Sequence, residues 1–175
     1  MTALIANAIA GALLATVAVW AFLQFPGLLV WAAFIGWASF FHTGGDSNAF
    51  KRSLACSFFG IVMAWAVAMV VASGATSLSA PLAAALAVLI VTPIIILISA
   101  IDIFSVIPAT FYGFASAFAF LAQTPGKFSL QAMTSFSLDN VLIVVPISLL
   151  IGALLGVLHI KIATALQSKQ SVSPA

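Results

Sequence analysis

The side chains that could do acid, base or metal chemistry are few: three aspartates, two histidines and no glutamate in 175 residues. Membrane pumps and ion-coupled carriers keep such a group inside the bilayer, because its binding of a proton or sodium ion drives the conformational change. Here Asp46, Asp102 and Asp139 each fall at the end of an apolar segment. The sequence therefore predicts no deeply buried coupling acid.

The two histidines suggest a metal site or a pH sensor only if they converge with a carboxylate. His42 is followed by a Gly-Gly turn and Asp46, and His159 stands just before Lys161. Both patterns are more typical of helix ends, where glycine and cationic side chains are favoured. No Ser-His-Asp set, His-Glu-x-x-His motif or phosphate-binding loop occurs in the sequence, so we expect no metal, no cofactor and no enzyme activity.

A repeated motif of small and aromatic residues is the other candidate site. The segment FIGWASFF at 34–41 reappears 77 positions later as FYGFASAF at 111–118, and the matched positions include Gly36 with Gly113 and Ser39 with Ser116. Small residues let helix backbones approach closely in lipid, where no hydrophobic driving force brings helices together. We expect the two glycines to cross near an internal twofold axis, beside a narrow Phe-lined passage carrying the hydroxyls of Ser39, Thr110 and Ser116.

Ordinary helix packing is the alternative explanation for any of these small residues. For Gly11 and Gly152, which lie in long apolar segments and have no matched partner in the repeated motif, ordinary packing is the interpretation we adopt.

The composition explains why so few residues can do chemistry. The chain is 65% hydrophobic and 5% charged, with a mean hydropathy of +1.32, values typical of an integral membrane protein. No charged residue occurs at 1–45 or 53–101. The net charge of +2 comes from scattered residues, which gives no indication of nucleic-acid binding.

The apolar segments alternate in length. A helix needs roughly 20 residues to span a hydrocarbon core of about 30 Å. Four segments reach this length and two shorter ones do not, because prolines at 26 and 108 precede or begin them and Pro favours the first turn of a helix. The long segments are Leu4–Leu23, Ser53–Ala72, Pro81–Ile101 and Val141–Ile160, and the short ones are Leu28–Phe41 and Pro108–Ala122.

The order long, short, long therefore occurs twice, which predicts an all-α integral membrane protein with about six transmembrane segments in two three-segment repeats. Repeat one would occupy residues 1–76 and repeat two 77–160 of a single transmembrane domain, followed by a polar tail at 161–175. If the short helices cross the membrane, the repeats are inverted; if they are broken or re-enter, the repeats are parallel. Paired short segments of this kind indicate a transporter-like site between the repeats.

Basic residues set the expected orientation, because Lys and Arg near membrane ends are retained in the cytoplasm. Six crossings with cytoplasmic termini place only Lys127 outside, where Asp139 can pair with it. Asp102 would then lie on the cytoplasmic side, either at the interface beside Lys51, Arg52 or Lys161, or lining a vestibule if the chain re-enters there.

Several apolar motifs resemble one known family. They are LLVWAAFIGW at 28–37, the Gly-Gly turn followed by Lys51 and Arg52, GIVMAWA at 60–66 and IPATFYG at 107–113. With them the chain is similar, over nearly its whole length, to the YcdZ-like family of small bacterial inner-membrane proteins, domain of unknown function 1097. The resemblance implies a multi-helix protein of the bacterial inner membrane and brings no assigned activity. Fainter likenesses to aromatic-acid exporters, fusaric-acid-resistance proteins and urea-channel halves rest on no matched functional residue.

The expected function is that of a channel or facilitative transporter for a small, mostly neutral solute. Such a solute can be selected by pore width, hydroxyls and aromatic walls without fixed charge. The pathway and packing candidates are Gly36, Ser39, Asp102, Pro108, Thr110, Gly113 and Ser116. The alternative is a non-transporting scaffold or accessory subunit of a membrane complex. In either case the bilayer is a partner, and outward small-residue faces favour a homo-oligomer.

Overall fold

The computed structural model describes residues 1–168 of the chain. These residues form helices joined by loops, with no β-strand among them, which confirms the all-α prediction. The helices are α1 (Ala3–Gln24), α2 (Val30–His42), α3 (Ser47–Ala72), α4 (Ala80–Leu97), α5 (Ile107–Gln123), α6 (Leu130–Thr134) and α7 (Val141–Ser168), and two 3-10 turns, η1 (Ile98–Ala100) and η2 (Asp102–Phe104), link α4 to α5.

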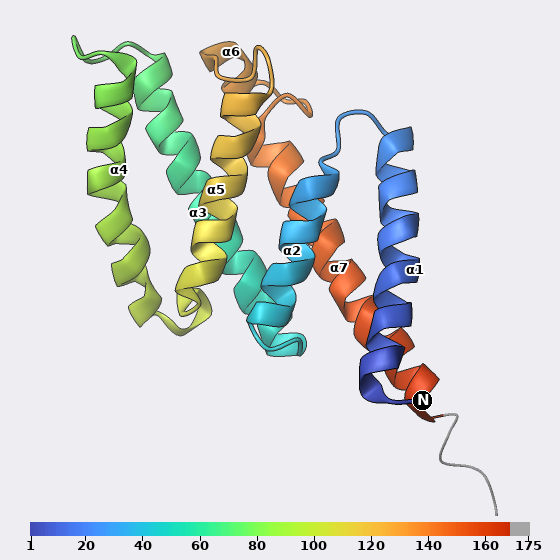
Figure 1. Ribbon diagram of the computed structural model, residues 1–175. Helices are drawn as coiled ribbons and strands as arrows, with labels where there is room; N and C mark the ends of the chain where they lie inside the picture. The colour runs from blue at the N-terminus through green and yellow to red at the C-terminus, as the bar shows by residue number, and fades with distance from the viewer. Residues whose placement is uncertain (169–175) are drawn as a thin grey trace, which may run out of the picture.

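The long helices alternate in direction between two ends of the bundle (Figure 1). One end holds the N-terminus, the loop 43–46, the turns η1 and η2 and the last residues of α7; we name it the terminal end. The opposite end holds α6 and the connections on both sides of it, and we name it the α6 end. Between these ends α1, α3 and α5 run one way and α2, α4 and α7 run the other.

Four helices are long and apolar enough to cross a membrane: α1, α3, α4 continued through η1, and α7. The two remaining main helices are shorter, as the prolines indicate. With 13 residues in α2 and 17 in α5, they extend about 20 and 26 Å at the usual helical rise. Pro108 lies in the first turn of α5, where its missing N–H costs no hydrogen bond.

Two helices extend beyond the segments that the sequence predicts. Asp46 caps α3, its carboxylate accepting a hydrogen bond of 2.6 Å from the Ala49 amide, and so α3 begins at Ser47 rather than near Ser53. At the other terminus α7 continues to Ser168, so the first part of the predicted polar tail is helical. Residues 169–175, the rest of that tail, lie outside the described residues.

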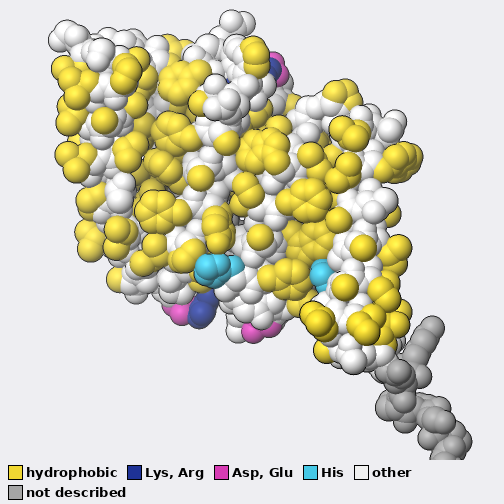
Figure 2. Space-filling view, in the orientation of Figure 1, with side chains coloured by type: hydrophobic (Ala, Val, Ile, Leu, Met, Phe, Trp, Pro, Cys, Tyr) yellow, Lys and Arg dark blue, Asp and Glu magenta, His cyan; other side chains and the backbone are white. Residues whose placement is uncertain are grey.

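The surface has the charge distribution of a membrane protein. Hydrophobic side chains cover the middle of the face shown in Figure 2, and the charged side chains visible there are confined to its two ends. Large exposed apolar side chains include Leu13, Leu89 and Leu154, each more than half exposed. A belt of this kind is stable only against lipid or a partner surface.

The helices of the two chain halves pack across one another. The most extensive contacts join α3 to α5 and α2 to α7, so each short helix lies on the last long helix of the other half. α1 packs on α7, and α4 packs on α3. The main core cluster gathers side chains of α3, α5, α6 and α7, including Ile61, Leu121, Met133 and Leu149.

Candidate functional site

The crossing of α2 and α7 is a direct backbone contact made by two glycines. A Cβ added at Gly36 would lie 2.8 Å from the Leu149 Cα, and one added at Gly152 would lie 2.9 Å from the Ala33 Cα. Real side chains do not approach backbone this closely, so only glycine fits at both positions without moving a helix.

The crossing of α3 and α5 is built in the same way. A Cβ at Gly113 would lie 2.7 Å from the Ser57 Cα, and one at Gly60 would lie 2.8 Å from the Phe114 amide nitrogen. The buried Ser57 hydroxyl also donates a 3.0 Å hydrogen bond to the Ala109 carbonyl. A side-chain hydrogen bond across two helices holds their register, and here it fixes α5 on α3.

These contacts correct two expectations from the sequence. Gly36 and Gly113 do not cross one another, because the nearest backbone to each belongs to the long helix of the opposite half. Gly152, expected to pack ordinarily, closes a crossing as tightly as Gly36 does. Gly11 does pack ordinarily, against the His159 ring 3.2 Å from an added Cβ. A glycine inside a long apolar helix is a signal that could have identified Gly60. The sequence alone does not show whether such a glycine contacts another backbone directly or packs more loosely.

The predicted hydroxyls are all fully buried near these crossings. Ser39 Oγ lies 2.7 Å from Ser53 Oγ, so this pair joins α2 to α3. Ser116, its counterpart in the repeated motif, has no hydrogen-bond partner for its hydroxyl among the described residues. Thr110 lies at the α3–α5 crossing, where its carbonyl faces Gly60. Aromatic side chains are close by, with Phe114 and Phe118 ring centroids 4.9 Å apart.

Asp102 takes the interfacial position rather than a vestibule. Its carboxylate forms an ion pair with the Arg52 guanidinium, 2.5 Å away, at the terminal end, and its side chain is 81% exposed. His42 lies at the same end, with its Nδ1 3.0 Å from the Tyr112 hydroxyl. Within residues 1–168, no three His, Cys, Asp or Glu side chains gather closely enough to hold a metal ion.

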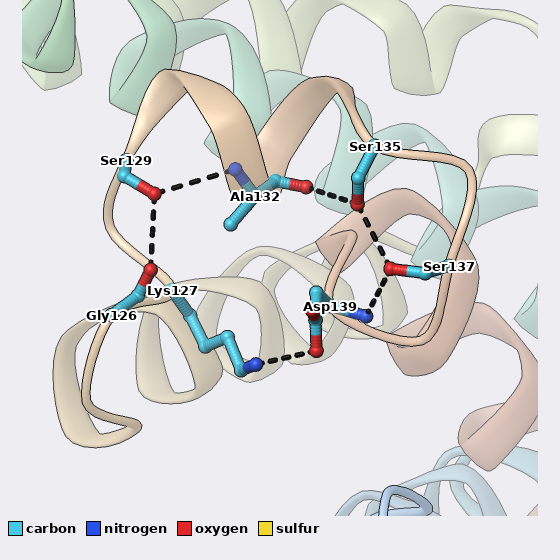
Figure 3. Close-up of polar contacts among 7 residues, drawn as sticks. All are labelled: Gly126, Lys127, Ser129, Ala132, Ser135, Ser137 and Asp139. Atoms are coloured by element: carbon cyan, nitrogen blue, oxygen red, sulfur yellow. Dashed lines mark hydrogen bonds and ion pairs between the residues drawn. The ribbon is translucent and has the colours of Figure 1, made fainter.

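A polar cavity of about 300 Å³ lies at the α6 end, among residues 125–139. Figure 3 shows its hydrogen bonds: Ser129 accepts from the Ala132 amide to cap α6, and Lys127 pairs with Asp139 at 2.5 Å. The serines here are occupied in holding the loop. Neither Ser39 nor Ser116 lines this cavity, so the buried hydroxyls do not open to it in this structure.

An apolar cavity of about 460 Å³ lies at the terminal end, between the start of α3 and the last part of α7. Its walls are hydrophobic and its rim carries charged residues. The lining residues are Phe40, Gly45, Asp46, Ser47, Phe50, Lys51, Leu154, Val157, Ile160 and Lys161.

Apolar helices of membrane-spanning length, with the charged residues of the described chain in loops or near helix ends, define an all-helical membrane protein. The chain belongs to the family described as "Protein of unknown function (DUF1097)", whose model matches residues 8–164. This match confirms the family that the apolar motifs predict. No curated protein and no solved structure matches the chain.

Proposed function

We propose that the chain is a channel or facilitative transporter for a small, mostly neutral solute, built from two inverted repeats of three helices. The observation that carries the proposal is the reciprocal packing of the halves: α2 lies on α7 and α5 lies on α3. If α1, α2 and α3 correspond to α4, α5 and α7, these two contacts are the same contact made twice.

The glycines support this correspondence residue by residue. Gly36 and Gly113 match at an offset of 77 positions, and Gly60 and Gly152 match at an offset of 92. The offset grows because the connection between α5 and α7 is longer and contains α6. Gly36 of α2 faces the α7 backbone, and its match Gly113 of α5 faces the α3 backbone. Gly152 and Gly60 face back across the same two crossings. The first helices of the two repeats also make matching contacts, because α1 packs on α7 and α4 packs on α3.

Inverted repeats suit transport because each half can adopt the conformation of the other. When the two halves exchange conformations, the pathway between them closes on one side of the membrane and opens on the other. The glycine crossings bring the backbones of α2 and α7, and those of α5 and α3, into direct contact between the two halves. The buried Ser116 hydroxyl, which has no partner among the described residues, is a polar group that a neutral solute could bind. The lack of an acid at membrane depth favours uncoupled movement.

Six crossings with both termini in the cytoplasm form part of the proposal. The terminal end carries Lys51, Arg52 and Lys161, and the α6 end carries Lys127. By the positive-inside rule the terminal end faces the cytoplasm of a bacterial inner membrane. Small residues on outward faces support a homo-oligomer.

The test is solute flux in liposomes containing the purified protein, with glycerol, urea and neutral amino acids as probes. We expect downhill equilibration of one probe without an ion gradient. Gly113→Leu should abolish that flux, because the side chain would separate α5 from α3, and Gly11→Leu serves as the matched control. If every probe crosses no faster than in protein-free liposomes, the transport proposal fails and the scaffold alternative is favoured.

A further inference from the structure

The apolar cavity at the terminal end has a counterpart at the α6 end that is filled. Under the repeat correspondence proposed above, Val157 in the wall of the cavity matches Trp65 of α3. Trp65 donates a 3.1 Å hydrogen bond to the Met133 carbonyl of α6. The Met133 side chain is 1% exposed and packs in the core cluster with Trp65, Ala68 and Leu142. An apolar group of the chain itself therefore occupies the matching groove.

No part of the described chain plays this role at the terminal end. The loop 43–46 that connects α2 to α3 is short and contains no helix, so it supplies no counterpart to Met133. Phe50, Val157 and Ile160 remain partly buried at the edge of a small core cluster around Phe40. The groove is left as a cavity of about 460 Å³ that opens at the surface.

The rim of this cavity carries two lysines and one aspartate. Lys51 and Lys161 are both exposed, and neither lies within ion-pair distance of a carboxylate among residues 1–168. Asp46 lies on the same rim, but its carboxylate is held at the start of α3 by the Ala49 amide. By contrast, Lys127 at the α6 end is neutralised by Asp139. The cavity at the terminal end therefore combines an apolar groove with two lysines that have no carboxylate partner among residues 1–168.

We propose that this cavity binds one anionic phospholipid, with an acyl chain in the groove and the phosphate between Lys51 and Lys161. The cavity follows α7 from Lys161 to Leu154, which is about 10 Å at the usual helical rise. This length runs from the headgroup level toward the bilayer centre, as an acyl chain does. Basic pockets between transmembrane helices on the cytoplasmic side suit anionic headgroups.

Native mass spectrometry of the purified protein in detergent tests the proposal, with phosphatidylglycerol and phosphatidylcholine as probes. We expect one tight phosphatidylglycerol site and much weaker phosphatidylcholine binding. Each lysine near an anionic headgroup contributes about fivefold, so Lys51→Ala with Lys161→Ala should weaken phosphatidylglycerol binding by about 25-fold. The pair Lys51→Arg and Lys161→Arg should keep the preference, and Lys127→Ala is the matched control at the other end.

A second variant tests the groove itself. Val157→Trp places in the groove the residue found at the matching position of α3, and it should weaken the binding of both lipids while the melting temperature stays near that of the wild type. Equal affinity for the two lipids, or an unchanged preference in the double alanine variant, would overturn the proposal. Displacement of phosphatidylglycerol by inorganic phosphate would also overturn it, because the groove would then contribute nothing. Lipid binding is measured without transport, so a failed flux assay leaves this result standing.

Discussion

Gly113→Ala is the simplest perturbation of the α3–α5 crossing. The added Cβ would lie 2.6 Å from the Ser57 carbonyl carbon and still closer to its oxygen. These are backbone atoms of a helix, so relief requires the helices to separate by about 1 Å, with loss of dispersion contacts along the crossing. Overpacking of this kind costs about 1–3 kcal/mol, and we expect the upper part of that range.

Gly11→Ala is the matched control. Both glycines lie inside helices, where alanine is favoured over glycine by about 1 kcal/mol. At Gly11 the added Cβ meets only the His159 ring at 3.2 Å, and a side chain can rotate away. Gly11→Ala should therefore leave stability unchanged or raise it by up to about 1 kcal/mol, while Gly113→Ala lowers it.

A double-mutant cycle makes the prediction specific to the crossing. Gly60 and Gly113 face the same interface from opposite helices, so once one alanine has separated α3 from α5, the second should cost little. Gly36 belongs to the other crossing, and its cost should add to that of Gly113. The measurement is unfolding in detergent, followed by tryptophan fluorescence. Equal effects of Gly11→Ala and Gly113→Ala, or additive costs for Gly60→Ala and Gly113→Ala, would refute the argument.

Three further predictions concern residues outside the glycines. Met133→Ala should destabilise the protein by about 2–5 kcal/mol, because it empties a buried site under α6, and an unchanged unfolding midpoint would show that α6 is not anchored by Met133. Asp102→Asn should lower the free energy of unfolding by less than about 1 kcal/mol, as expected for an exposed ion pair, and flux should need no proton gradient in either protein. If the wild type instead concentrates a solute with a proton gradient and Asp102→Asn does not, Asp102 is a coupling site. Ser39→Ala should lower the free energy of unfolding by about 1 kcal/mol, because it leaves the Ser53 hydroxyl without its partner. Ser116→Ala removes a buried hydroxyl with no partner among residues 1–168, so it should be neutral or stabilising. Equal losses of stability in the two variants would contradict this contrast.

Much of the helical architecture follows from the sequence. Hydropathy and the prolines predict all six main helices, because a membrane segment must be apolar over a fixed length and Pro108 marks a helix start. Charge placement predicts that Asp102 and Arg52 lie on one side and that Lys127 and Asp139 pair on the other, as the structure shows. The ends of α3 and α7 are less predictable, because capping by Asp46 extends α3 through polar residues that hydropathy excludes.

The pairing of helices is the part that the sequence does not determine. The repeated motif identifies Gly36 and Gly113 as special positions, but a glycine is compatible with close approach by any backbone, so its partner cannot be deduced. Leu149 and Ser57, which those glycines contact, carry no recognisable feature of a crossing. The α6 helix has only five residues, too few for a hydropathy pattern to show that it forms or that Met133 is buried.

Labelling of single cysteines from the two sides of the membrane tests the inverted-repeat account most directly. In a Cys56→Ala background, Asn48→Cys reports the terminal end in the first turn of α3, which the loop 43–46 joins to α2, and Gln123→Cys reports the α6 end at the last residue of α5. Both native residues are exposed. Because α2 and α5 are matched helices of inverted repeats, a membrane-impermeant maleimide should label Gln123→Cys from outside and Asn48→Cys only after the membrane is opened. Labelling of both from the same side would show that the repeats are parallel, and the account would be wrong.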